Sequence, residues 1–370
     1  MIEIVTEKGR KIPLTKPTFH IHDLIKIHQK MNNNSSISCI GLTKTYRNFK
    51  AVDSLTMDVN QGDIFGFLGP NGAGKTTTIR MLCSLLSPSA GHAMVAGLDI
   101  IKDSTTIRKI IGLLPESSGF YNWMNAEEYL LHFAALYKIE RSTGMRRTRE
   151  LLESVGLADR SSAPIGYYSR GMKQRLGLAR SLINEPRIIF LDEPTLGLDP
   201  KGQQDIQKIL LELNHEKEVT IFLSSHALGD VYSLCNRMAI VDHGELVAQG
   251  SIEELRKLAG GSNGIVVSIL NSEELEKKLS NLHYRFEINA GKNNKIIDVF
   301  IFEGISESIN EILDAIKKID LQIYEVRRSE MSLEDLFFKL TGTKEYSQEN
   351  TIGNKYKLEV EQFRSITENK

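Results

Sequence analysis

Short, wholly apolar runs alternate with segments of helical periodicity between residues 37 and 258. The runs 64–68 and 188–191 have the length and composition of strands that are buried on both faces of a sheet. Between such runs, 127–136 and 146–155 carry apolar residues three and four positions apart, which is the spacing of an amphipathic helix. This alternation predicts an α/β domain with a mostly parallel sheet covered by helices.

The same pattern divides the chain into zones. Residues 1–36 form an N-terminal extension that ends in a polar linker, and 37–258 form the main domain, in which about 117–180 lacks strand runs and predicts an inserted helical lobe. After a glycine-rich hinge, 265–345 predicts a small α+β domain, and 346–370 is a polar tail. The strand runs of the small domain are 265–270, 296–302 and 321–326, and its helical stretches are 272–280 and 305–318.

Composition limits the compartment and the partners. The 46 basic and 47 acidic residues give a formal net charge of −1, so we expect no bulk attraction to nucleic acid. The three cysteines lie far apart without Cys-x-x-Cys spacing, which argues against a disulfide framework or a zinc site. The apolar runs are much shorter than the roughly 20 residues that span a bilayer, and the N-terminal residues do not resemble a signal peptide. We therefore expect a soluble, cytoplasmic chain.

A glycine-rich turn follows the apolar run 64–68 and precedes a helical pattern. Such a turn directs backbone N–H groups at phosphate oxygens, and the following helix presents its positive end to the same anion. We expect Lys75 to reach the β- and γ-phosphates and the Thr76 hydroxyl to bind Mg²⁺. Because strand and helix stand in the right places, a chance glycine turn is the weaker interpretation. The candidate phosphate-binding residues are Gly69, Pro70, Asn71, Gly72, Ala73, Gly74, Lys75, Thr76 and Thr77.

Two adjacent carboxylates, Asp192 and Glu193, end the apolar run 188–191. In open parallel sheets, ligands bind at the carboxyl ends of the strands. We expect Asp192 to hold the Mg²⁺ shell and Glu193 to polarise the attacking water as a general base. Taken alone, Asp-Glu-Pro is better explained as a strand that ends in a turn. The catalytic interpretation therefore depends on the phosphate-binding turn.

Residues 168–175, with the sequence YSRGMKQR, complete a set of motifs that resembles the ATP-binding cassette (ABC) proteins, whose signature motif is Leu-Ser-Gly-Gly-Gln. At the start of a helix, Ser169 and Gly171 can offer a hydroxyl and bare N–H groups to a phosphate. In the family these groups face the nucleotide held by the opposite subunit. The resemblance thus implies two cassettes that close head to tail around two ATP molecules.

Further positions match the family in the same order along the chain. Asp199, which follows Gly197 and Leu198, resembles the loop by which each cassette senses its partner. His226 resembles the switch histidine that contacts the γ-phosphate, and Tyr46 resembles the aromatic residue that stacks on adenine. A lone histidine is more often structural, but the position of His226 directly after the strand run 219–223 favours the switch role.

Four positions depart from the family pattern. Glu116 stands where glutamine is usual; its carboxylate can offer an oxygen near Mg²⁺ or a water, but it adds negative charge beside the γ-phosphate. Tyr168, Arg170 and Met172 replace Leu, Gly and Gln of the signature, and Arg170 adds a cation that can approach phosphate. These changes fit a branch of the family rather than a loss of function.

That branch is indicated by 113–116, 169–175 and 332–342, which are similar to cassettes that power export permeases for drugs, antibiotics and sodium. The resemblance covers about 37–345. The fold it implies is α/β: a P-loop NTPase cassette, with a mostly parallel sheet, an antiparallel β edge and an inserted helical lobe, plus a small C-terminal α+β domain.

The function it implies is ATP hydrolysis that drives export of a drug, antibiotic or ion. ATP and Mg²⁺ are then the ligands, and the partners are a separate membrane permease and a second cassette subunit, identical or related. The chain would sit peripherally on the cytoplasmic face of the cell membrane. The alternative is a cassette that acts on ribosomes or DNA, but such members carry two cassettes with a basic linker or a long coiled coil, and we find neither. Intact Lys75, Asp192, Glu193 and His226 argue against a regulatory protein without turnover.

Overall fold

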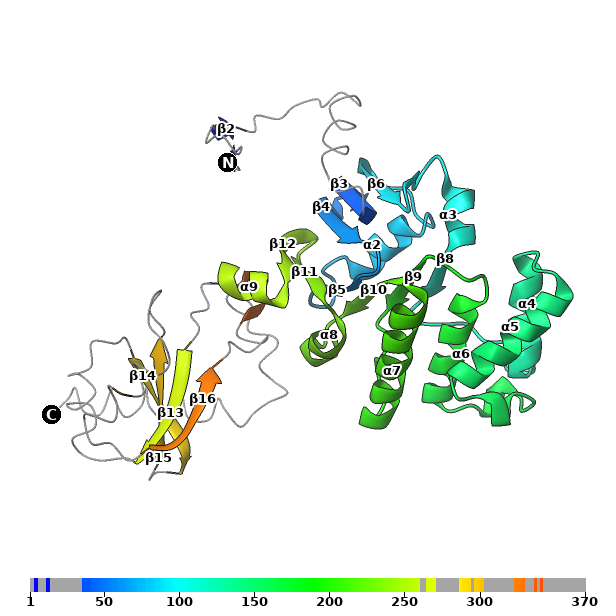
Figure 1. Cartoon of the computed structure of the whole chain (residues 1–370). Coiled ribbons are helices and arrows are strands. Elements are labelled where there is room, and N and C mark those ends of the chain that lie inside the picture. Colours follow the sequence, from blue (N-terminus) through cyan, green and yellow to red (C-terminus); the bar gives the residue numbers. More distant parts are fainter. Residues whose placement is uncertain are drawn as a thin grey trace.

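The part of the chain from Ser35 to Ala259 is built in layers around two sheets (Figure 1). A four-stranded antiparallel sheet lies on one side, helix α2 lies between the sheets, and helices α6, α7 and α8 cover the far face of the larger sheet. The computed structural model describes residues 3–5, 11–13, 35–259, 264–270, 286–293, 296–302, 314, 323–329, 336–337 and 340–341.

The larger sheet has, among the described residues, the strand order β12-β11-β5-β10-β9-β8, and only β12 runs antiparallel to its neighbour. This confirms the predicted α/β fold with a mostly parallel sheet. The strands are β5 (Ile64–Leu68), β8 (Ile111–Leu114), β9 (Ile188–Asp192), β10 (Thr220–Ser225), β11 (Arg237–Asp242) and β12 (Glu245–Ser251).

Alternate residues of these strands enter two different hydrophobic clusters, which explains why the runs are apolar throughout. Toward α2 (Lys75–Leu82), Phe65, Phe67, Phe190 and Phe222 form an aromatic cluster with Phe222 at its centre. Toward the other face, the aliphatic residues of the same strands meet α6 (Arg170–Leu182), α7 (Pro200–Lys217) and α8 (Leu228–Leu234).

The antiparallel sheet has the order β4-β3-β6-β7 and carries a tight hairpin at its outer end. Arg47 takes a φ of 52° in the hairpin turn, which places Tyr46 opposite Phe49. The strands are β3 (Ser35–Tyr46), β4 (Phe49–Asn60), β6 (Ala90–Val95) and β7 (Leu98–Asp99), and α3 (Ser104–Ile110) leads from this sheet to β8.

A group of helices follows β8. It contains α4 (Ala126–Leu136), which begins with a reciprocal capping box between Asn125 and Glu128, α5 (Arg141–Ser154) and the short 3-10 turns Ala158–Arg160 and Ile165–Tyr167. Arg180 of α6 joins this group to the sheet. Its guanidinium donates to the Tyr129 hydroxyl at 3.0 Å and to the Leu113 carbonyl of β8 at 3.4 Å.

After α9 (Ile252–Leu258), four described strands form an antiparallel sheet in the order β14-β15-β13-β16. They are β13 (Gly264–Leu270), β14 (Phe286–Asn293), β15 (Ile296–Phe302) and β16 (Ile323–Ser329). Strand β14 was not expected, because its sequence FEINAGKN lacks an apolar run. The predicted helices 272–280 and 305–318 lie outside the described residues, apart from the helical Asp314. Leu336 and Phe337 are buried in the same cluster as Leu255 of α9.

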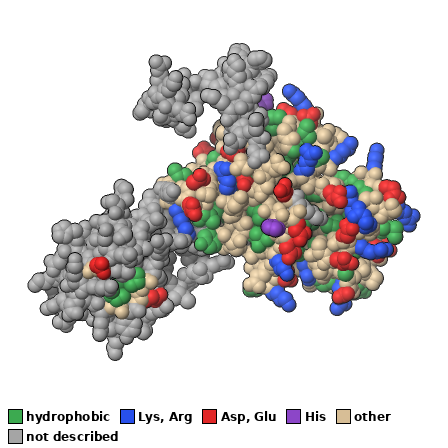
Figure 2. Space-filling model, viewed as in Figure 1, with side chains coloured by type: hydrophobic (Ala, Val, Ile, Leu, Met, Phe, Trp, Pro, Cys, Tyr) green, Lys and Arg blue, Asp and Glu red, His purple; other side chains and the backbone are tan. Residues whose placement is uncertain are grey.

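Near the N-terminus, β1 (Glu3–Val5) pairs antiparallel with β2 (Lys11–Pro13), where the sequence had suggested only an extension. The three cysteines are buried free thiols, and burial raises the pKa of the Cys39 thiol to about 12. Among the described helices, none is both long and apolar enough to cross a bilayer. On the face shown in Figure 2, acidic and basic side chains are interspersed over the described part, as the near-neutral net charge predicts.

We expect Phe222→Ala to be strongly destabilising, because its ring is fully buried and lies within 5.6 Å of the rings of Phe65, Phe67 and Phe190. Removing such a side chain lowers the free energy of unfolding by about 3–5 kcal/mol. Urea unfolding followed by fluorescence would measure the loss, with the exposed Tyr167→Ala as the control that changes little. Equal midpoints for the two variants would contradict the central place of Phe222.

Candidate functional site

The glycine-rich turn connects β5 to α2, and two of its glycines are required by close backbone contacts. A Cβ on Gly69 would come within 2.4 Å of the Val241 carbonyl oxygen, and one on Gly74 within 2.2 Å of the Ala51 carbonyl oxygen. Gly74 also has a φ of 92°, which favours glycine. The turn is thus pressed against β4 and β11, and its outer side remains open to a cavity.

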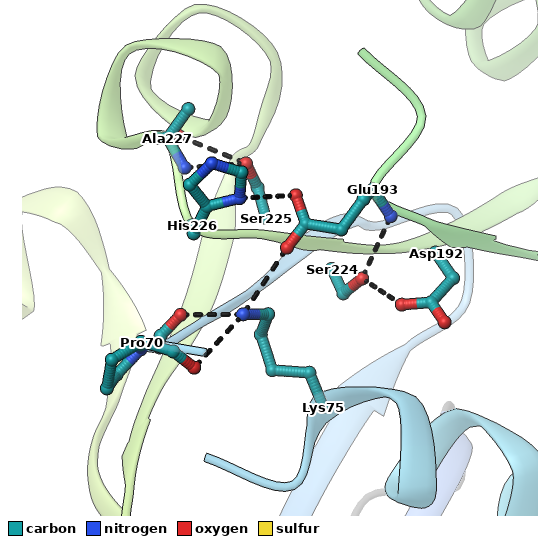
Figure 3. A network of polar contacts seen from close by, with 9 residues as sticks. Pro70, Lys75, Asp192, Glu193, Ser224, Ser225, His226 and Ala227 are labelled. Atoms are coloured by element: carbon teal, nitrogen blue, oxygen red, sulfur yellow. Dashed lines mark hydrogen bonds and ion pairs between the residues drawn. The ribbon is translucent and has the colours of Figure 1, made fainter. Parts of the chain in front are cut away.

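Lys75 is the first residue of α2, and only 7% of its surface is exposed. Its ammonium Nζ donates to the carbonyl oxygens of Gly69 at 2.7 Å and Pro70 at 3.2 Å, and lies 3.3 Å from Oε1 of Glu193 (Figure 3). A buried cation requires such a complete set of oxygen partners. The sequence placed Lys75 at the phosphate site, and the structure adds that the lysine is directly paired with the proposed general base.

Asp192 and Glu193 are adjacent in sequence, but their carboxylates point to different partners (Figure 3). The hydroxyl of Ser224, on the neighbouring strand β10, donates to Oδ1 of Asp192 at 2.6 Å and accepts the backbone N–H of Glu193 at 3.0 Å. Glu193 has a φ of 52°, a left-handed conformation that costs a non-glycine residue about 1–3 kcal/mol. Ser224 therefore holds the strained turn that separates the two carboxylates.

His226 follows β10 and faces Glu193. Its Nδ1 lies 2.8 Å from Oε2 of Glu193, so that the carboxylate bridges the histidine and Lys75. The turn that carries the histidine is fixed by Ser225, whose hydroxyl accepts the N–H of Ala227 at 2.9 Å. Figure 3 shows these groups converging from three separate segments of the chain.

These groups border a cavity of about 440 Å³, within the size range of small-molecule sites. It is lined by Tyr46, Phe49, Ala51, Pro70, Asn71, Gly72, Gly74, Lys75, Thr76, Thr77, Glu116, Glu193, Leu196 and His226. Tyr46 and Phe49 present partly exposed rings at its rim. The Lys44 ammonium lies 5.4 Å from the centroid of the Tyr46 ring and donates to the Ser87 carbonyl at 2.7 Å, which ties the ring to the segment after α2.

Most of the residues singled out in the sequence thus meet at one cavity. Of the others, Gly69 supplies a carbonyl to Lys75, Ala73 is buried behind the turn, and Asp192 is joined to the cavity through Ser224. Ser169, Gly171 and Asp199 do not line it. Ser169 instead caps α6 by accepting the Met172 N–H at 3.2 Å, and Asp199 caps α7 by accepting the Gly202 N–H at 3.2 Å.

The donors around the cavity suit a hard divalent cation that arrives with a nucleotide. Thr76 and Glu116 line the cavity with a hydroxyl and a carboxylate, and Asp192, buried behind Ser224, offers a second carboxylate; oxygen is the ligand type that Mg²⁺ prefers. Within the described residues, no group of three His, Cys, Asp or Glu side chains could hold a metal by itself. The set therefore fits Mg²⁺ bound by one or two protein ligands together with phosphate oxygens and water.

Three contributors were missed in the sequence: Ser224, Lys44 and Phe49. Ser224 belongs to the LSSH segment that holds His226, but its role depends on the sheet register, which pairs it with Asp192. Lys44 and Tyr46 are two residues apart on one strand and therefore share a face, a signal that alternation along β3 could have given. The Cys83 thiol lies near the site; burial, and secondarily the charge of Asp192, raises its pKa well above the ordinary value.

Comparison with known proteins agrees with this geometry. Residues 52–196 match the family described as ABC transporter. The bacitracin transport ATP-binding protein BcrA of Bacillus licheniformis is 36% identical over 306 residues, which cover 83% of this chain and 97% of that protein. The linearmycin resistance ATP-binding protein LnrL of Bacillus subtilis is 30% identical over 313 residues, covering 81% and 96%. A solved ATP-binding subunit of an ABC transporter superposes with a TM-score of 0.56 at 28% identity, covering 61% of this chain and 93% of that one.

A double-mutant cycle between Ser224→Ala and Asp192→Ala tests the hydroxyl bridge. We expect each variant to lower the free energy of unfolding by about 1–3 kcal/mol, because each leaves a buried polar group without its partner. The double variant should lose less than the sum, with a coupling of about 0.5–3 kcal/mol. Denaturant unfolding of the nucleotide-free protein measures all four states, and strictly additive losses would contradict the bridge.

Proposed function

Because this chain belongs to the ATP-binding subunits of ABC transporters, we propose that it is the motor of an exporter, with Lys75, Glu193 and His226 at its catalytic centre. The chain is an ATPase, and the relatives reported above are transport and resistance subunits, which favours transport over action on ribosomes or DNA. The assignment of the catalytic centre depends on one observation: the carboxylate of Glu193 lies between the Lys75 ammonium and the His226 ring and contacts both.

Binding of ATP would change the partners of Lys75. The γ-phosphate carries more negative charge than a single carboxylate, so it competes with Glu193 for the ammonium. Glu193 then keeps its contact with His226 and is free to accept a proton from the attacking water. When bound, Mg²⁺ would neutralise charge on the phosphate oxygens, and Thr76 and Asp192, with Glu116 near them, are the residues that would hold it.

Tyr46 would stack on the adenine, with Lys44 steadying the ring from the protein side. Gly69, Gly72 and Gly74 would let the backbone approach the phosphates, and the start of α2 at Lys75 and Thr76 would face the same anion. Pro70, Asn71, Ala73 and Thr77 complete the turn around these groups.

A second cassette subunit would complete the site. Ser169, Gly171 and Asp199 lie at the starts of α6 and α7, away from the cavity of their own protomer. We propose that they face the nucleotide of the opposite subunit, as the family resemblance implies. This explains why the residues expected to bind nucleotide fall into two separate groups within one chain.

An exposed aromatic patch near the helical group is the surface we assign to the membrane permease. It consists of Tyr121, Trp123 and Tyr167, which are 45%, 74% and 86% exposed. Their two segments are joined by backbone hydrogen bonds from Ile165 to Met124 and from Gly166 to Asn122, both 2.9 Å. Exposed aromatic side chains of this kind are typical of protein interfaces. A cytoplasmic segment of a separate permease would place the chain peripherally at the inner face of the membrane.

The relatives suggest the cargo. One relative is named for bacitracin transport and another for linearmycin resistance, and they are 36% and 30% identical to this chain. We propose that the complete transporter exports a drug or antibiotic, and that the permease, rather than this subunit, contacts it.

Glu193→Gln tests the catalytic assignment. The amide keeps the size of the side chain but cannot act as a base, so we expect ATP turnover to fall about 10²- to 10⁴-fold while ATP binding persists. With hydrolysis blocked, light scattering should show a stable dimer in the presence of ATP. Lys75→Ala is the control that should bind no ATP and form no dimer. Normal turnover by Glu193→Gln would exclude Glu193 as the base.

Trp123→Ala tests the permease surface. Truncation of a central interface aromatic typically costs 2 kcal/mol or more, so we expect clear loss of the subunit from membranes that contain its permease. The ATPase activity of the isolated subunit should stay unchanged, because Trp123 does not line the cavity. Tyr232→Ala, an exposed aromatic on α8, is the matched control. Undiminished membrane association of the Trp123 variant would assign the contact to another surface.

A further inference from the structure

Arg170 stands where the signature motif of the family has glycine, and it lies against a loop of its own protomer. The loop, residues 194–199, connects Glu193 to α7. An ideal Cβ on Gly197 would come within 2.3 Å of both Cζ and Nη1 of Arg170 and within 2.5 Å of Nη2. The guanidinium therefore occupies the space that any larger side chain at position 197 would need. Gly197 also has a φ of 70°, a backbone conformation that favours glycine, and the absence of a Cβ lets the guanidinium take this position.

One hydrogen bond and one close approach also link the same end of α6 to this loop. Nε2 of Gln174 donates to the carbonyl oxygen of Pro194 at 2.7 Å, where the loop begins. At the other end, Gly171 faces Leu198, whose Cδ2 would be 3.9 Å from a Cβ on the glycine. Arg170 thus lies against the loop at Gly197, between the approaches at Pro194 and Leu198.

The loop also borders the catalytic cavity. A second cavity of about 490 Å³ lies between α6 and residues 116–122, and Arg170 and Lys173 are among its lining residues. It shares Glu116, Glu193 and Leu196 with the nucleotide cavity. Leu196 closes a turn on the general base, because its N–H donates to the Glu193 carbonyl at 3.2 Å. The position of the loop is therefore connected to the position of Glu193.

We propose that Arg170 is a positioning residue that fastens the 194–199 loop to the start of α6 within one protomer. A guanidinium suits this task, because it is a broad planar group that can occupy the space beside a glycine while its long stem spans the distance from the helix. Ser169, Gly171 and Asp199 are then held as one surface. That this surface meets a second cassette rests on the proposed function; the fastening itself does not.

The competing role for Arg170 is direct contact with the phosphate of the partner's ATP. The two roles differ in when they act. Fastening of the loop is present in a single, nucleotide-free protomer, whereas a phosphate contact exists only in the ATP-bound dimer. An observable in the nucleotide-free protein therefore separates them.

Hydrogen–deuterium exchange of the full, nucleotide-free chain is the test. Arg170→Met keeps the aliphatic stem and a good helix former but removes the guanidinium. We expect the amides of Leu196 and Leu198, which close turns on Glu193 and Thr195, to exchange about fivefold faster, equivalent to about 1 kcal/mol. Arg170→Lys, which keeps the charge without the planar group, should also exchange faster than the wild type. Lys173→Met removes one charge from the same helical turn and cavity and should leave both amides unchanged.

Unchanged exchange of Leu196 and Leu198 in Arg170→Met would overturn the proposal. If the same variant in a Glu193→Gln background then failed to dimerise on ATP, Arg170 would be assigned to the phosphate instead. If Leu196 and Leu198 also exchanged faster in Lys173→Met, loss of any positive charge near the loop would explain the result. That outcome would also overturn the proposal. Failure of the Glu193→Gln parent to dimerise would count against the proposed function, while the exchange result would still decide the role of Arg170.

Discussion

The site depends on the register of three neighbouring parallel strands, β5, β10 and β9. Ser224 of β10 pairs with Asp192 of β9, and Ser225 of β10 pairs with Leu68 of β5. The carboxyl ends of the three strands therefore lie within about one residue of each other along the sheet. The phosphate turn, the two carboxylates and the histidine turn all leave the sheet from this edge. A slip of one residue would reverse the faces of the shifted strand and remove the Ser224 hydroxyl from Asp192. The aromatic cluster beneath the edge, where Phe222 meets Phe65, Phe67 and Phe190, resists such a slip.

The buried charges at the site are paired with one another in the nucleotide-free protein. Lys75 and Glu193 are each only 7% exposed, and burial of opposite charges is tolerated only when each finds enough polar partners. Two carbonyls and Glu193 surround the ammonium, while the carboxylate also reaches His226. The protein therefore satisfies its own charges before ATP arrives. In the function that we propose, ATP would exchange partners with these charges instead of filling an unsatisfied site, and the exchange would release Glu193 when the phosphate is in place.

The sequence was most informative where a single segment determines the chemistry. The apolar runs predicted the parallel sheet, and the turn from Gly69 to Thr76 predicted a phosphate site, because strand, turn and helix follow one another along the chain. It was least informative where distant segments meet. The bridge by Ser224 depends on register, and the contact between Arg170 and Gly197 depends on side-chain direction, so neither has a local signal. Strand β14 was missed because pairing with β15, rather than its own apolar content, holds it in the sheet.

The cap of α6 suggests how one residue serves both folding and recognition. A serine hydroxyl has one hydrogen to donate and two lone pairs to accept with. Ser169 uses a lone pair to accept the Met172 N–H, so its hydrogen remains available for a phosphate oxygen. The cap also fixes the χ1 angle, and it therefore aims the donor before any partner approaches. Asp199 caps α7 in the same way, through Oδ1. Helix capping thus preorganises the groups that we propose to face the nucleotide of the opposite subunit, so that little additional entropy would be lost when the dimer closes.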